Sequence, residues 1–236
     1  MPARVPLSRR LATASRWPFG VALTSWRYMW RTVPMHRSEE EGSWADDGPP
    51  DLPDDVHLDE VLHPPAGAGP LFRRRYRGRI READMSAREL VQKISDDLDL
   101  VAPREFASFT KVRGEKGGME VGDECVVRMP GPWDGPVRVI EKTPESFRFV
   151  TLEGHLEAGQ IRFQARDEEL LEFTIESWAR AGDRLSNLLF DQLRMSKEIQ
   201  LHMWTSLLER VARMVNGRIT GGIDIETRRV DHADPR

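Results

Sequence analysis

Cysteine is almost absent from this sequence, and its scarcity excludes two kinds of stabilising chemistry. Cys125 is the one cysteine among 236 residues, so the chain forms no internal disulfide and no cysteine-based zinc cluster. The six histidines are scattered, and no two have the spacing that places a pair of metal ligands on one helix face. We therefore expect no metal site, and we expect a cytoplasmic protein.

Long apolar runs are also missing. None approaches the roughly 18–20 residues that span a bilayer, and the basic N-terminus lacks the clean hydrophobic region of a secretory signal. Neither a Walker motif nor a dinucleotide-binding glycine motif is present, so we expect no cofactor. A net charge of −4 argues against nucleic acid as a partner.

Residues 1–37 contain seven arginines and no acidic residue. Within them, aromatic and aliphatic residues recur at helical spacing and predict a basic amphipathic helix over 17–33. Such a helix could lie on a membrane surface, where Trp and Arg suit the interface. We favour the alternative, in which this arm packs on its own domain.

Residues 38–69 are rich in acidic residues and proline, a composition typical of an extended linker. A compact domain is predicted from residue 70 to residue 217. Its first strand is expected at 71–80, and Ser86 with Glu89 has the spacing of a capping box at the start of a helix. The remaining residues, 218–236, are interpreted as a tail with one short extended element and a frayed, charged end.

A series of apolar runs separated by turn residues follows the predicted helix. A strand is expected at 106–112, followed by runs at 125–129, 137–140, 147–152, 160–164 and 170–178. Short separators favour antiparallel hairpins. Alternation places seven side chains on candidate buried faces: Phe147, Phe149, Ile161, Phe163, Leu171, Phe173 and Ile175.

A long helix is predicted from Asp183 to about Val215, with Gly217 as the stop signal. It carries two apolar lines, so it must be covered on more than one side. The line from Leu185 to Met214 should face the strands. The line through Trp204 and Leu208 should meet the N-terminal helix.

Strand, helix, antiparallel strands and long helix, in that order, predict an α+β fold in which a curved antiparallel sheet wraps around the C-terminal helix. This order is similar to the helix-grip fold of the START-like (SRPBCC) superfamily. Residues 70–216 further resemble a family of uncharacterised bacterial and plant proteins known as a domain of unknown function. The runs that carry this resemblance are 121–124, 135–139, 151–163 and 177–180, above all the Gly-His-x-Glu-x-Gly hairpin at 154–159.

The resemblance implies a hydrophobic cavity between sheet and long helix that holds a lipid or a polyketide-like molecule. It transfers no catalytic residue. Some superfamily members are cyclases or hydroxylase components, so a cyclase- or isomerase-type enzyme is an alternative. The third alternative is a membrane-associated interaction protein that uses residues 17–33.

His155 and Glu157 are candidates for acid–base chemistry, because His titrates near neutral pH and Glu157 could orient it. The competing interpretation is a glycine-bounded turn in which His155 makes a local hydrogen bond. Glu172 and Glu176 share one strand face and could line a cavity, although water-facing carboxylates are the simpler assignment.

Arg128 and Trp133 flank an unusual Pro/Gly-rich loop. Trp133 could close a cavity mouth and Arg128 could bind a carboxylate or phosphate. Alternatively, Trp133 pins a surface loop and Arg128 pairs with Glu124. On the long helix, the candidate ligand contacts are Gln192, Ser196 and Met203. Gln192, Ser196 and the neighbouring Gln200 could hydrogen-bond a ligand, or equally the sheet backbone or water.

Overall fold

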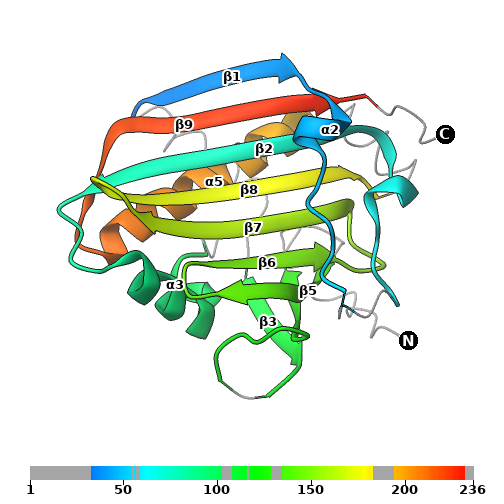
Figure 1. Ribbon diagram of the computed structural model, residues 1–236, viewed down its shortest axis with the longest axis horizontal. Helices are drawn as coiled ribbons and strands as arrows, with labels where there is room; N and C mark the ends of the chain where they lie inside the picture. The colour runs from blue at the N-terminus through cyan, green and yellow to red at the C-terminus, as the bar shows by residue number, and fades with distance from the viewer. Residues whose placement is uncertain are drawn as a thin grey trace, which may run out of the picture.

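Nine strands and three α-helices form the described part of the chain in this computed structural model (Figure 1), which covers residues 33–54, 56, 59–102, 108–115, 117–128, 134–182 and 194–231. The strands are β1 (Met35–Glu41), β2 (Ala68–Arg81), β3 (Ser108–Arg113), β4 (Glu124–Arg128), β5 (Asp134–Thr143), β6 (Ser146–Thr151), β7 (Glu157–Asp167), β8 (Leu171–Ala181) and β9 (Arg218–Val230). The helices are α2 (Trp44–Asp47), α3 (Ala87–Asp96) and α5 (Arg194–Met214), with short 3-10 turns at Pro64–Ala66 and Leu98–Leu100.

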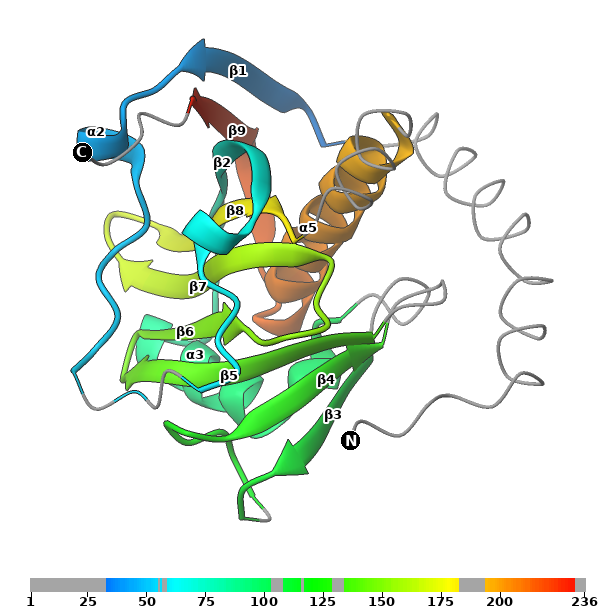
Figure 2. The same ribbon diagram turned by 90° about the vertical axis from the view of Figure 1, so that its right-hand side faces the viewer.

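All nine strands belong to one sheet, in the order β1-β9-β2-β8-β7-β6-β5-β4-β3. Neighbours from β9 to β3 pair antiparallel, whereas β1 pairs parallel with β9. The run from β2 through α3, β3–β8 and α5 has the predicted element order. The chain therefore has the α+β helix-grip fold, in which the sheet curves around α5 (Figure 2).

Helix α3 has the predicted start. Ser86 Oγ accepts from the backbone N–H of Glu89, and the Glu89 carboxylate accepts from the N–H of Ser86, so the capping box is complete. Its apolar side packs with the sheet, and Leu90, Val91 and Ile94 are buried.

The core lies on the concave side of the sheet, beneath α3 and α5. The aromatic residues of the predicted buried faces meet there: the rings of Phe147 and Phe163 stack with centroids 4.9 Å apart, and Phe149 meets both edge-on. Phe173 and Ile175 of β8 join the same cluster. The predicted alternation of the central strands is confirmed.

The second apolar line of α5, which was predicted to meet the N-terminal helix, packs on the sheet through Trp204 and Leu208, and its contact with that helix stays a prediction. The Trp204 ring lies 5.8 Å from that of Phe163, and Leu208 is buried in the same core cluster as Leu207 of the first line. A curved sheet contacts a broad sector of a helix that lies in its hollow, because β9, β2 and β8 all lie against α5. Residues 183–193 and the predicted helix at 17–33, except Val33, lie outside the described residues.

The end of α5 differs slightly from the prediction. Asn216, and not Gly217, takes the left-handed conformation that ends the helix, with φ of 50°. The N–H of Gly217 then reaches back to the carbonyl of Ala212 at 2.9 Å. The chain turns directly from this cap into β9.

The predicted tail is largely a strand. β9 pairs with β2 along almost its whole length, and Ile223 and Ile225 are buried in the core. The interpretation of 226–236 as frayed is wrong up to Val230, because these residues pair with β2, Glu226 and Arg228 form ion pairs, and Val230 is buried.

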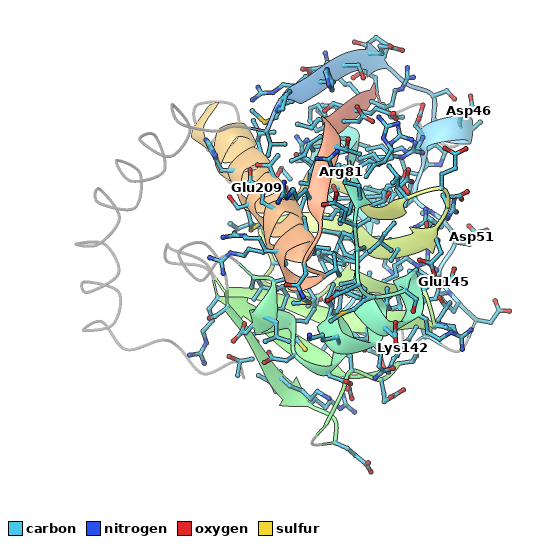
Figure 3. All side chains as sticks on the ribbon, turned by 90° about the vertical axis from the view of Figure 1, so that its left-hand side faces the viewer. Asp46, Asp51, Arg81, Lys142, Glu145 and Glu209 are labelled. Atoms are coloured by element: carbon cyan, nitrogen blue, oxygen red, sulfur yellow. The ribbon has the colours of Figure 1, made fainter. Side chains whose placement is uncertain are left out.

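The predicted linker also belongs to the folded unit. Residues 35–41 form β1, and the described residues between Ser43 and Leu62, hereafter the outer segment, cross the convex side of the sheet. Leu62 donates to the carbonyl of Thr151 at 2.9 Å, and Val61 bridges to Leu152. Figure 3 shows Asp46 and Asp51 of this segment on the side of the sheet opposite Glu209 of α5. These acidic residues lie over a sheet face rich in arginine, which explains why they do not form a free linker.

Candidate functional site

β2 separates two chemical environments, because its alternate side chains point to opposite faces of the sheet. Tyr76 lies in the concave core, and Arg74, two residues earlier, points to the same side and reaches α5. Arg73 and Arg75 point to the convex side, where they meet Glu176. The run of arginines in β2 thus supplies one cation to the interior and several to the outer face.

A polar group lies on the concave side where β2, β7 and α5 meet. Arg74 Nη1 donates to Gln200 Oε1 at 3.0 Å, and Gln200 Nε2 donates to Glu157 Oε1 at 2.6 Å. Arg74 is only 5% exposed. We call Arg74, Gln200 and Glu157 the polar end of the grip.

Apolar side chains continue from the polar end along the concave side. Ile161 follows Glu157 on the same face of β7, and Trp204 follows Gln200 by one turn of α5. Val127 of β4 and Phe109 of β3 are paired directly opposite each other. All four apolar residues pack against the core cluster but are only partly buried, in contrast to Phe147 and Phe149 beside them. We call Phe109, Val127, Ile161 and Trp204 the half-buried lining.

His155 lies in the turn that leads into β7. Its Nδ1 is 2.9 Å from the backbone nitrogen of Glu157 and 3.0 Å from the carbonyl oxygen, so the turn itself engages this ring nitrogen. Burial lowers the pKa of His155 below its ordinary value, and the nearby Glu157 opposes this shift. This geometry matches a local structural hydrogen bond, because the backbone of Glu157 occupies Nδ1. The role of His155 as a catalytic base stays a prediction.

The two glycines that bound this hairpin have different roles. Gly154 has a φ of 93°, a conformation that glycine adopts most easily. A Cβ atom on Gly159 would lie 1.9 Å from the carbonyl oxygen of Trp178. Gly159 therefore allows β7 to approach β8 closely. Backbone geometry thus accounts for both glycines of the hairpin, Gly154 and Gly159.

The remaining predicted site residues are not brought together by the described structure. Arg128 is exposed at the end of β4, on the face opposite Val127. Its suggested partner Glu124 pairs instead with Arg138 and Arg113. Met203 is buried on α5. Trp133 and Gln192 lie outside the described residues, as does the side chain of Ser196.

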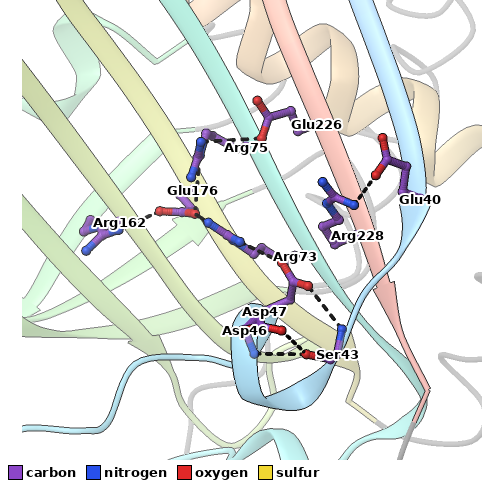
Figure 4. Close-up of polar contacts among 10 residues, drawn as sticks. All are labelled: Glu40, Ser43, Asp46, Asp47, Arg73, Arg75, Arg162, Glu176, Glu226 and Arg228. Atoms are coloured by element: carbon purple, nitrogen blue, oxygen red, sulfur yellow. Dashed lines mark hydrogen bonds and ion pairs between the residues drawn. The ribbon is translucent and has the colours of Figure 1, made fainter.

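Glu172 and Glu176 lie on the convex side, away from α5, so they do not line the space beneath that helix. Glu176 is also not water-facing: it is 4% exposed and is held by Arg73, Arg75 and Arg162 under the outer segment (Figure 4). Burial alone would raise the pKa of Glu176, but hydrogen bonds from Arg162 and Arg73 outweigh it and the pKa is lowered.

Two other features are absent from the described residues. No group of three or more His, Cys, Asp or Glu side chains in these residues could hold a metal ion. Within the same residues, no helix combines the length and the apolar character that crossing a bilayer requires.

Sequence reasoning missed Arg74, the interior cation. A usable signal was present, since Arg74 and Tyr76 share a strand face and an aromatic residue in a run of arginines marks the buried side. Gln200 was expected to bond a ligand, the sheet backbone or water, and it instead bonds two side chains of the sheet, those of Arg74 and Glu157.

No family model matches this chain, and a search of curated proteins finds no match either. The resemblance to the family of unknown function therefore stays an expectation.

Solved structures do resemble the chain in fold. A ginseng major latex-like protein 151 from Panax ginseng is 13% identical, with a TM-score of 0.47, and the match covers 62% of this chain and 99% of that one. Protein CV1439 from Chromobacterium violaceum is 14% identical, with a TM-score of 0.41 over 61% of this chain and 96% of the other. Protein Ms6760 from Mycobacterium smegmatis is 12% identical, with a TM-score of 0.41 over 70% and 96%. The helix-grip assignment itself rests on the strand order and pairing described above.

Proposed function

We propose that this chain binds a hydrophobic small molecule on the concave side of the sheet, next to α5. The half-buried lining is the observation that carries this proposal. Phe109, Val127, Ile161 and Trp204 come from three strands and the helix, yet each retains exposed surface although it packs on the core.

Partly exposed apolar surface in a concave setting favours an apolar ligand. Each Å² of apolar surface that a ligand removes from contact with water stabilises the complex by about 25 cal/mol. Small-molecule sites are mostly apolar with a few polar groups that fix orientation. The polar end of the grip supplies such groups within one helical turn of Trp204. A lipid or a polyketide-like compound has this mixed character.

Binding can be measured with the neutral dye N-phenyl-1-naphthylamine, whose fluorescence rises in apolar surroundings, and with 1-dodecanol as a competitor. We expect the full chain to bind the dye and 1-dodecanol to displace it. Failure of the dye to bind would overturn the proposal.

Val127 and Val126 provide a matched pair of variants for this assay. They are neighbours on β4, both are partly buried, and they point to opposite faces of the sheet. Val127→Gln places a polar group in the half-buried lining and should weaken dye binding several-fold, whereas Val126→Gln should not. Thermal unfolding confirms that both variants are folded, and equal dye affinity of the two would contradict the proposed location.

A further inference from the structure

We infer that the ligand is an acid, and that Arg74 binds its carboxylate at the polar end of the grip. This inference rests on the proposed function, because it names the head group of the molecule whose apolar part lies on the half-buried lining. It assigns to Arg74 a role that the predicted Arg128 does not fill, since Arg128 is exposed on the opposite face.

Arg74 differs from the other arginines near it in what it contacts. Arg73, Arg75 and Arg77 of the same strand, and Arg162 of β7, each form ion pairs with carboxylates on the convex side. Arg74 forms no ion pair with any described side chain. Its one hydrogen bond from the guanidinium within this part of the chain goes to the neutral amide of Gln200, and its Cζ lies 4.7 Å from the centre of the Phe72 ring.

A buried guanidinium with a single neutral partner is incompletely compensated. Removing a charge from water is costly unless an opposite charge and further hydrogen bonds replace the water. Arginine has five N–H donors in a fixed planar arrangement that matches the two oxygens of a carboxylate. A carboxylate on the concave side would supply the missing charge and take up donors that Gln200 does not use.

The polar end and the apolar lining are arranged as an amphipathic acid would require. Glu157, Ile161 and Phe163 occupy one face of β7, while Gln200 and Trp204 lie one turn apart on α5. Gln200 contacts Glu157 and Trp204 contacts Phe163, so side chains of α5 reach the concave face of β7 at two levels. Four residues of strand extend about 13 Å, enough to separate a head group from the apolar body that follows.

Glu157 restricts the charge that this site accepts. The side-chain amide of Gln200 bridges the Glu157 carboxylate and the Arg74 guanidinium, because it hydrogen-bonds to both groups. A second negative charge on the ligand would be repelled by Glu157, so a carboxylate with one charge suits the site better than a doubly charged head group. Gln200 holds its amide with the oxygen toward Arg74 and the nitrogen toward Glu157, which sets the position of both.

The test compares dodecanoate with 1-dodecanol, two ligands of equal chain length that differ in the carboxylate. Each displaces N-phenyl-1-naphthylamine from the full chain at pH 8, in the original protein and in Arg74→Gln, Arg75→Gln and Glu157→Gln. Arg75→Gln is the matched control, since Arg75 is the next residue of β2 and points to the convex face.

Arg74→Gln should raise the Kd of dodecanoate on the order of tenfold, the effect of losing a charge-assisted hydrogen bond, and leave that of 1-dodecanol unchanged. Arg75→Gln should change neither value. Glu157→Gln should lower the Kd of dodecanoate alone, and it provides an independent variant should Arg74→Gln fail to fold.

Equal effects of Arg74→Gln on acid and alcohol, or an unchanged Kd of dodecanoate in both Arg74→Gln and Glu157→Gln, would overturn the assignment of the carboxylate to Arg74. In those cases the dye and 1-dodecanol still bind, and the proposed function stands. Absence of binding by the dye and by both ligands would instead overturn the proposed function, and this inference with it.

Discussion

Asp47 Oδ1 accepts a hydrogen bond from Arg73 Nη1 at 2.7 Å, and this contact attaches the outer segment to the convex face of the sheet. The same arginine also donates to Glu176, so a residue before the first central strand shares a cation with a residue of β8. Asp47 is 8% exposed despite its acidic, proline-rich surroundings. The outer segment therefore contributes to the stability of the sheet that carries the candidate site.

Asp47→Asn should lower the free energy of unfolding by about 1–3 kcal/mol, because it removes the buried charged partner of the partly buried Arg73. Urea denaturation followed by circular dichroism measures this change. Asp54→Asn is the control, since Asp54 lies in the same segment but is exposed, and it should change stability by less than about 0.5 kcal/mol. Equal stability of the two variants would show that the outer segment is not held through Asp47.

β9 should be required for folding. A chain that ends at Gly217 lacks Ile223 and Ile225, which are buried in the core, and leaves one edge of the long β2 strand unpaired. We expect such a chain to aggregate or to lose cooperative thermal unfolding. A chain that ends at Asp231 keeps all of β9 and should unfold as the full chain does. Cooperative unfolding of the shorter chain at a similar temperature would contradict the prediction.

The central part of the fold was predictable because local chemistry and tertiary environment agree there. Ser86 and Glu89 form a capping box whatever the helix packs on, and Phe147 and Phe149 recur at every second position because they share the face of β6 that packs into the main core. Each of these signals lies within a few residues of the element that it defines.

The outer strands were not predictable in the same way. β1 has the sequence MHRSEEE, which carries no apolar alternation, because it is an edge strand held through backbone pairing with β9. In β9, Gly221 and Gly222 have positive φ angles at a register shift against β2, so its alternation is interrupted. The partner of Arg74 was not predictable from neighbouring residues, because Gln200 lies on a helix distant in the sequence.

The thiol of Cys125 should be unreactive in the folded protein. It is 3% exposed, and burial raises its pKa from 9.0 to about 11. Since the thiolate is the nucleophile, two pKa units lower its fraction at pH 8 by about 100-fold, before access is considered. Iodoacetamide labelling at pH 8, followed by mass spectrometry, should be at least that much slower in the folded chain than in urea. Rapid labelling of the folded chain would contradict the burial of this residue.

His155 should make the protein less stable as the pH falls below neutrality. Burial lowers its pKa in the folded state below the ordinary value of 6.5. As the pH drops through 6.5, the unfolded chain therefore binds a proton that the folded chain does not, and the free energy of unfolding decreases. A single such group contributes at most about 1.4 kcal/mol per pH unit.

His155→Asn should remove this part of the acid sensitivity, since Asn offers an acceptor to the N–H of Glu157 but does not titrate. The urea midpoints of both proteins at pH 7.5 and pH 5.5 give the comparison, and proton NMR of the histidine ring checks the pKa directly. We expect the midpoint of the original chain to fall further on acidification than that of the variant. An identical decrease in both would mean that other groups carry the pH dependence, and that the turn before β7 tolerates a charged imidazole.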